Sequence, residues 1–216
     1  MGAADPAWRF TAETRFPRVM CDAVLLPDGT VFLAGGSSGG GALSGATPVL
    51  ETELYDPATE RWTVLTPIHT PRLYHVSAVL TPDGRVMIAG KDGPLNPFPY
   101  HYAEHRVEMF SPPYLFRGPR PVIADAPAEV RYGENFVVRS PDAAAVATAV
   151  LMRPDSSTHS VHMDQRLVGL EITGRDGDGL TVQAPPNANV APEGYYMLFL
   201  LSRAGVPSVA RFVRVR

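Results

Sequence analysis

The sequence is poor in residues that would cross-link the chain, charge it or anchor it in a membrane. It contains one cysteine, Cys21, so no disulfide can form within the chain, and the redox compartment stays open. Charged residues make up only 19% and the net charge is -3, which argues against a nucleic-acid partner, because such proteins usually present a basic patch. No apolar run is long enough to span a bilayer.

The first ten residues, MGAADPAWRF, also lack the basic and apolar regions of a secretory signal. Two expectations follow and both stay open. Either the protein is cytoplasmic, or its natural start, with any signal, lies upstream of this chain.

Turn-forming residues, in contrast, are abundant: the 216 residues include 22 prolines and 19 glycines. Hydrophobic residues make up 45%, which is enough for a substantial core. Because β-branched and aromatic residues are well represented, this composition predicts an all-β protein rather than a disordered one.

The first half contains an internal repeat. Residues 22–36, DAVLLPDGTVFLAGG, resemble residues 77–91, SAVLTPDGRVMIAGK, and residues 51–66 resemble 105–116. An Asp-Gly pair between two apolar runs predicts a β-hairpin. The spacing of about fifty residues is typical of kelch-type propeller blades, each a four-stranded antiparallel sheet. The alternative is a pair of unrelated hairpins in a sandwich.

Two blades would leave unpaired sheet edges, since closed propellers have four to eight. We therefore expect the missing blades in another part of a larger protein, or in another chain. Residues 112–121, PPYLFRGPRP, predict a stiff, extended linker. After it, about seven short alternating segments predict an immunoglobulin-like sandwich. The predicted division is residues 1–116 for the two blades and residues 117–216 for the sandwich.

Candidate metal ligands lie in both parts. Tyr74 and His75 are adjacent, where a strand is expected to begin, and His159 lies in a polar loop, RPDSSTHSVHMDQR. Histidine is the commonest protein metal ligand, and copper(II) accepts nitrogen and oxygen ligands with one position open. From the residues alone this signal is weak, and packing of Tyr74 and His75 at a strand start, with solvation of His159, is the more ordinary interpretation.

Four ordered blocks carry a resemblance to a known family. They are PRLYHVSAVLTPDGRVMIAG, VEMFSPPYLFRGPRPVI, RPDSSTHSVHMDQR and APEGYYMLFLLSRAGVPSVA. The chain resembles the C-terminal part of the galactose oxidase/glyoxal oxidase family of copper radical oxidases. The resemblance implies one copper ion held by Tyr74, His75 and His159, with Tyr74 as axial ligand and catalytic proton acceptor.

The resemblance further implies oxidation of a primary alcohol, aldehyde or carbohydrate by dioxygen, with release of hydrogen peroxide, in a family that is usually secreted. The family's radical tyrosine, cross-linked to a cysteine, normally lies in earlier blades. Cys21 is not an obvious substitute, and a small, partly buried thiol is its simpler interpretation. We therefore expect the chain alone to turn over little, and whether it is itself an enzyme stays open. The alternative is a non-catalytic module that binds carbohydrate or protein.

Other polar residues near these motifs are expected to have roles other than copper binding. His162 falls where relatives show a less basic polar residue, and we leave it outside the copper set. Arg72 is interpreted as structural, and residues 164–166 as fixing the loop of His159. His101 and His105 flank an aromatic segment that either lines a substrate mouth or packs on itself.

Overall fold

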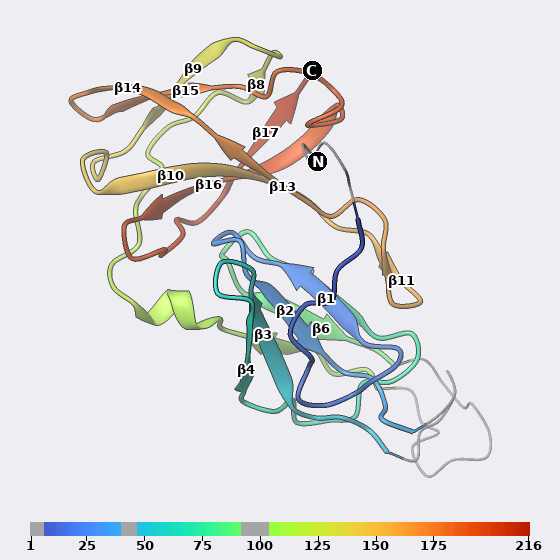
Figure 1. The fold of residues 1–216 in the computed structure, drawn as a ribbon. Helices are drawn as coiled ribbons and strands as arrows, with labels where there is room; N and C mark the ends of the chain where they lie inside the picture. The colour runs from blue at the N-terminus through green and yellow to red at the C-terminus, as the bar shows by residue number, and fades with distance from the viewer. Residues whose placement is uncertain (1–6, 40–46, 92–103) are drawn as a thin grey trace.

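The computed structural model describes residues 7–39, 47–91 and 104–216. Across these ranges the regular structure is almost entirely β-strand, with one short 3-10 helix, as Figure 1 shows. This confirms the predicted all-β class. In the same ranges, no helix is long and apolar enough to cross a bilayer.

The first sheet is a four-stranded antiparallel meander in chain order. Its strands are β1 (Asp22–Leu25), β2 (Val31–Ala34), β3 (Thr52–Asp56) and β4 (Arg61–Leu65). The turn between β1 and β2 is the expected one: Gly29 has a φ of 85°, which favours glycine, and the Asp28 carboxylate accepts a hydrogen bond from the Thr30 amide. The predicted hairpin is confirmed.

The second sheet repeats the pattern with three strands. They are β5 (Ser77–Leu80), β6 (Val86–Ala89) and β7 (Glu108–Phe110), again antiparallel. The segment that the repeat aligns with β4 is instead a short helix, η1 (Pro113–Phe116). Pro112, which precedes it, and Pro113, which begins it, offer no amide hydrogen to a ladder, so a paired strand is disfavoured there.

The prediction of a stiff, extended linker over residues 112–121 is therefore wrong in its first part. Within η1, Tyr114 is 1% exposed, and its hydroxyl donates to the Gly84 carbonyl at 2.5 Å. Further along, the Arg120 guanidinium donates to the carbonyls of Pro207 and Ser208 at 2.8 and 2.7 Å. The segment that connects the two parts is thus bonded to the first half at its start and to the C-terminal part at its end.

The C-terminal part contains two main sheets and a small hairpin. The five-stranded sheet has the order β13 (Arg166–Leu170), β10 (Val146–Arg153), β16 (Gly194–Ser202), β17 (Arg211–Val215), β8 (Glu129–Val130). The three-stranded sheet has the order β14 (Ile172–Asp176), β15 (Gly179–Gln183), β9 (Asn135–Arg139). Residues of both sheets share one apolar core. The hairpin is β11 (Ser157–Thr158) and β12 (Val161–His162).

The central strands of the five-stranded sheet are buried on both faces. Side chains of its central strands, β10 and β16, alternate between two cores: Ala149, Leu151, Tyr196, Leu198 and Leu200 face the three-stranded sheet, whereas Val150, Met152, Met197, Phe199 and Leu201 join the core of β1, β2, β5 and β6. In Figure 1 this sheet accordingly lies between the other two groups of sheets. Burial on both faces explains the unbroken apolar run in GYYMLFLL.

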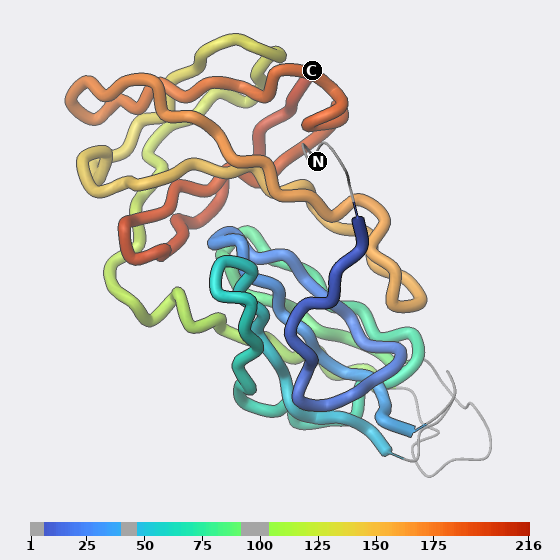
Figure 2. Tube along the Cα trace, in the orientation of Figure 1, coloured from blue at the N-terminus to red at the C-terminus, as the bar shows by residue number. Residues whose placement is uncertain are grey.

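The β11–β12 hairpin leaves the C-terminal part and reaches the first half of the chain. Figure 2 shows this segment, in orange, running beside the blue and green strands. β11 contacts β5, and β12 contacts β1. A loop of residues 153–166 is thereby brought to the start of both inner hairpins.

Candidate metal centre

Each repeat contains a buried arginine that binds a glutamate of the third strand. In the first repeat, Arg18 and Glu53 form an ion pair at 2.6 Å, with side chains 2% and 0% exposed. In the second, Arg72 and Glu108 form the corresponding pair at 2.9 Å, and the Arg72 side chain is 0% exposed. Each arginine also donates to the carbonyl of the glycine that ends the second strand. The repeat is therefore structural as well as sequential.

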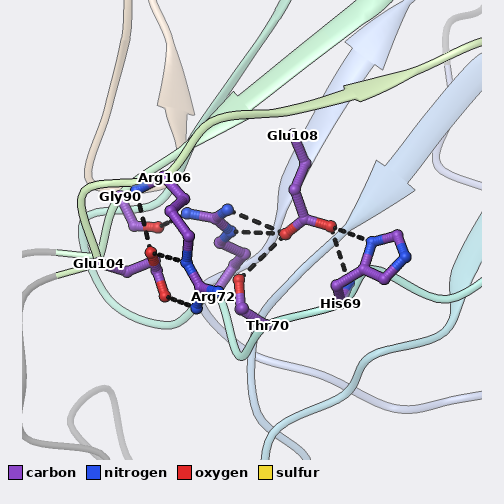
Figure 3. A network of polar contacts seen from close by, with 7 residues as sticks. All are labelled: His69, Thr70, Arg72, Gly90, Glu104, Arg106 and Glu108. Atoms are coloured by element: carbon purple, nitrogen blue, oxygen red, sulfur yellow. Dashed lines mark hydrogen bonds and ion pairs between the residues drawn. The ribbon is translucent and has the colours of Figure 1, made fainter.

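Figure 3 shows how Arg72 is held. Its guanidinium lies between the Glu108 carboxylate and the Gly90 carbonyl. Glu108 also accepts from the His69 amide and ring at 2.8 Å, and from the Thr70 hydroxyl at 3.0 Å. Partial burial opposes ionisation of Glu108, but these bonds outweigh it and lower its pKa to about 2. The structure supports the structural interpretation of Arg72.

Tyr74 and His75 occupy a tight turn that begins immediately after this anchor. The Val76 amide donates to the Leu73 carbonyl at 2.9 Å, and β5 begins only at Ser77. His75 has a φ of 63°, a left-handed conformation that is uncommon for histidine. The irregular backbone removes the alternation of a strand, so neighbouring side chains can serve one site.

Gly90 makes room for this turn. It has a φ of 80°, and a Cβ atom there would lie 2.5 Å from the His75 carbonyl oxygen. Any side chain would therefore displace the backbone of His75. Together, Arg72 on one side and Gly90 on the other fix where the imidazole of His75 emerges.

His159 reaches the same place from the β11–β12 hairpin. It occupies the two-residue turn with Ser160, at φ values of 53° and 60°. Both positive φ values match the hairpin turn type that follows the right-handed twist of paired strands. The Thr158 hydroxyl lies 2.7 Å from Nδ1 of His159. When Nδ1 donates to that oxygen, the lone pair stays on Nε2, the nitrogen that points away.

The three predicted site residues come together. The Tyr74 and His75 rings are stacked with centroids 3.9 Å apart, and the His159 ring meets both edge-on, at 5.5 Å from Tyr74 and 4.4 Å from His75. Nε2 of His75 lies 2.9 Å from Nε2 of His159. His159 is exposed and the other two are half-buried, so solutes can reach the group.

The two imidazoles are spaced as ligands of a first-row metal ion such as copper would be. An imidazole nitrogen binds a first-row metal at about 2.0 Å, so two such ligands at right angles are about 2.8 Å apart. The observed separation of 2.9 Å between the two Nε2 atoms is close to this expected nitrogen–nitrogen distance. In the part of the chain that the structure describes, no group of three or more His, Cys, Asp or Glu side chains could hold a metal. The candidate set is two imidazoles and a phenol.

Cys21 immediately precedes β1 and packs against Gly36. A Cβ atom added at Gly36 would lie 3.1 Å from the Cβ atom of Cys21. Burial is the main cause that raises the pKa of its thiol. A raised pKa favours the neutral thiol over the thiolate that binds metals. These observations support the interpretation of Cys21 as a small, partly buried side chain.

The remaining predicted residues divide between described and undescribed parts of the chain. His101 lies outside the described residues, and His105 is exposed. Gln165 does fix the His159 loop, because its amide nitrogen donates to the Ala23 carbonyl at 3.0 Å and its oxygen accepts from the Leu25 amide. Arg166 instead donates to backbone carbonyls of residues 189 and 190, within the C-terminal part.

One polar cluster was not foreseen from the sequence. Asp22, Asp155 and His162 are buried together beside the candidate ligands. The repeat contains a hint of this cluster, because Asp22 in the first copy aligns with Ser77 in the second. Only the first inner hairpin therefore begins with a buried carboxylate.

The comparisons with known proteins cover both halves of the chain. Residues 1–114 match the family described as Glyoxal oxidase N-terminus, and residues 120–215 match Galactose oxidase-like, Early set domain. The chain belongs to the galactose oxidase/glyoxal oxidase family. The predicted resemblance is therefore confirmed, and this is a family of copper radical oxidases.

Individual relatives of this galactose oxidase-like chain are oxidases. An aldehyde oxidase GLOX of Vitis pseudoreticulata is 39% identical over 97% of this chain and 43% of its own length. A galactose oxidase of Gibberella zeae is 33% identical over 93% and 30%, respectively. A solved fungal alcohol oxidase of the AA5 family, in complex with copper, superposes with a TM-score of 0.85 at 37% identity, over 95% of this chain and 44% of its own. This chain thus spans less than half the length of these relatives.

Proposed function

We propose that this chain supplies the copper-ligand portion of a copper radical oxidase-like protein, with Tyr74, His75 and His159 as metal ligands. The observation that carries the proposal is the 2.9 Å separation of the two Nε2 atoms, which come from residues 84 positions apart in sequence. In this proposal residues 1–116 are two kelch-type blades, and residues 117–216 are an immunoglobulin-like early-set domain.

The reaction of the complete protein is the oxidation of a primary alcohol or aldehyde. For an alcohol, two electrons and two protons pass to dioxygen, giving an aldehyde and hydrogen peroxide. When bound, copper supplies a Lewis acid for the substrate oxygen and accepts one of the two electrons. The other electron requires the redox tyrosine that the family resemblance implies, which we expect in the portion that this chain does not span.

The residues of this chain have distinct tasks in that reaction. His75, from the first half of the chain, and His159, from the C-terminal part, would together hold the copper ion. The Tyr74 phenolate accepts the proton of the substrate hydroxyl as general base. The Tyr74 ring stacks on the His75 ring, with 3.9 Å between centroids, which restricts the movement of the phenol. The exposure of His159 leaves the ion open to a small alcohol, aldehyde or carbohydrate.

Copper titration of the purified chain tests the proposal. Electron paramagnetic resonance should show one copper(II) per chain with nitrogen ligands, and His159→Ala should abolish this stoichiometric signal. His105→Ala is the matched control, because it removes an exposed histidine outside the group. Retention of the full signal by His159→Ala would refute the ligand assignment.

A peroxide-release assay on simple alcohols and aldehydes then separates an enzyme from a binder. We expect little turnover from the chain alone, and turnover once the rest of the relatives' length is supplied in one polypeptide. An extended protein that binds neither copper nor these substrates would instead favour the alternative, a non-catalytic module for carbohydrate or protein. The extended gene would also show whether a signal peptide directs secretion, which we propose by analogy with the family.

A further inference from the structure

His162 lies in a buried position between two carboxylates. Its Nδ1 contacts an Asp155 carboxylate oxygen, and its Nε2 lies 3.6 Å from Oδ1 of Asp22. The side chains of Asp22, Asp155 and His162 are 0%, 4% and 8% exposed. Buried polar atoms are normally hydrogen-bonded. Among the described residues, His162 Nε2 and Asp22 Oδ1 are buried without a hydrogen-bond partner, and they face each other.

Asp22 is the point where three elements meet. It begins β1, and its Oδ2 accepts from the Ala78 amide of β5 at 2.6 Å and from the Ser157 hydroxyl of β11 at 2.9 Å. Its other oxygen faces His162 of β12. One carboxylate therefore connects both inner hairpins of the first half to both strands of the hairpin that carries His159.

Histidine suits this position for a chemical reason. Its ring carries two nitrogens on opposite edges, so one small side chain can face two carboxylates at once. Asp155 precedes β11 and Asp22 begins β1, so His162 bridges a loop of the C-terminal part to a strand of the first half. An asparagine carries both of its N–H donors on one nitrogen and an acceptor oxygen at the other end, so it could serve only one of the two carboxylates in this way.

We propose that His162 is a positioning residue, whose contacts with Asp22 and Asp155 set the β11–β12 hairpin so that His159 meets His75 at metal-binding distance. This inference rests on the proposed function, because it assigns His162 a role in building the copper site. His162 itself is not a ligand: both of its nitrogens face carboxylates, and it pairs with Ser157 at the base of the hairpin, whereas His159 lies in the turn at the tip.

The hairpin has a second attachment, which limits the expected effect. Gln165 holds the base of the loop to β1 through the backbone of Ala23 and Leu25. Loss of His162 therefore loosens the tip that carries His159 without releasing the whole loop. Removal of groups that orient metal ligands typically weakens metal binding 10- to 100-fold, and we expect the lower end of that range.

The test compares His162→Ala and His162→Asn with the unaltered 216-residue chain, and uses His105→Asn as a control at an exposed histidine. Copper(II) affinity is measured by competition titration, and the ligand field by electron paramagnetic resonance. We expect about tenfold weaker binding and changed hyperfine splitting for His162→Ala, an intermediate result for His162→Asn, which can keep the Asp155 contact, and no change for the control. Unchanged affinity and spectrum in His162→Ala would overturn the proposal.

Hydrogen exchange of the metal-free chain separates this inference from the proposed function. His162→Ala should speed amide exchange in residues 157–162 while the strands of the five-stranded sheet stay protected. If no protein in the series binds copper, the copper-site proposal fails, and exchange still decides whether His162 orders the hairpin. Equal exchange in the unaltered and His162→Ala chains would overturn the positioning role whatever the copper result.

Discussion

The substitution Glu108→Gln tests whether the Arg72 anchor holds the turn of the candidate ligands. It removes the charge that faces a guanidinium with no exposed surface, while the side-chain volume is kept. Breaking a buried ion pair from one side typically costs about 3–5 kcal/mol. Because Glu108 is 19% exposed and the Gly90 carbonyl still accepts from Arg72, we expect a smaller loss, about 2–3 kcal/mol of unfolding free energy.

The pH dependence of stability is a second way to measure how much the Glu108 carboxylate contributes to the unfolding free energy. The pKa of Glu108 falls from its ordinary value of 4.5 to about 2 in the folded chain. A lowered carboxyl pKa stabilises the fold above pH 4.5, and this stabilisation is lost as the pH falls from 4.5 through about 2. The shift corresponds to at most about 3–4 kcal/mol, and to about 2 kcal/mol once solvent screening is allowed for.

Urea denaturation of both proteins between pH 7 and pH 2.5 measures these effects. The stability gap between the unaltered chain and Glu108→Gln should be widest at pH 7 and should narrow below pH 4.5. Asp178→Asn is the control, because its partner Arg139 and Asp178 itself are both 56% exposed, and such pairs contribute less than about 1 kcal/mol. A gap that is independent of pH, or no larger than that of the control, would refute the reasoning.

Three further substitutions or reactions test other parts of the structure. Gly90→Ala should cost about 1–3 kcal/mol in unfolding free energy and weaken copper binding, because its Cβ would meet the His75 carbonyl; urea denaturation and copper titration measure the two effects. Tyr114→Phe should cost about 1–2 kcal/mol in thermal unfolding, because it leaves the Gly84 carbonyl without its buried donor. The Cys21 thiol should react with a disulfide reagent at pH 8 more slowly in the folded chain than in urea, because burial raises its pKa; equal rates would contradict this.

Local features of the fold were open to prediction from the sequence. The Asp-Gly turns at residues 28–29 and 83–84 fix both inner hairpins, because glycine alone adopts their positive φ without strain. The turn that holds Tyr74 and His75 is equally local, because the bond from the Val76 amide to the Leu73 carbonyl closes it. Such features depend on residues that are neighbours along the chain.

Features that depend on distant residues were missed or mistaken. The pairing of Arg72 with Glu108 joins positions far apart in sequence, and the arginine alone gives no sign of its partner. The segment after β7 has the pattern of the fourth strand of the first repeat, yet its prolines favour η1. The burial of His162 between two carboxylates depends on the packing of the two parts of the chain, so the residues around it in the sequence give no sign of it.

The sheet that belongs to two cores has a consequence for how an ion would be captured. A hinge movement between the halves of the chain would uncover Phe199 and its neighbours on β16, which are sealed from water. Such opening is opposed at about 25 cal/mol for each Å² of apolar surface that becomes wet. The distance between the His75 and His159 imidazoles is therefore fixed when the chain folds. A cation would bind to a site that is already formed.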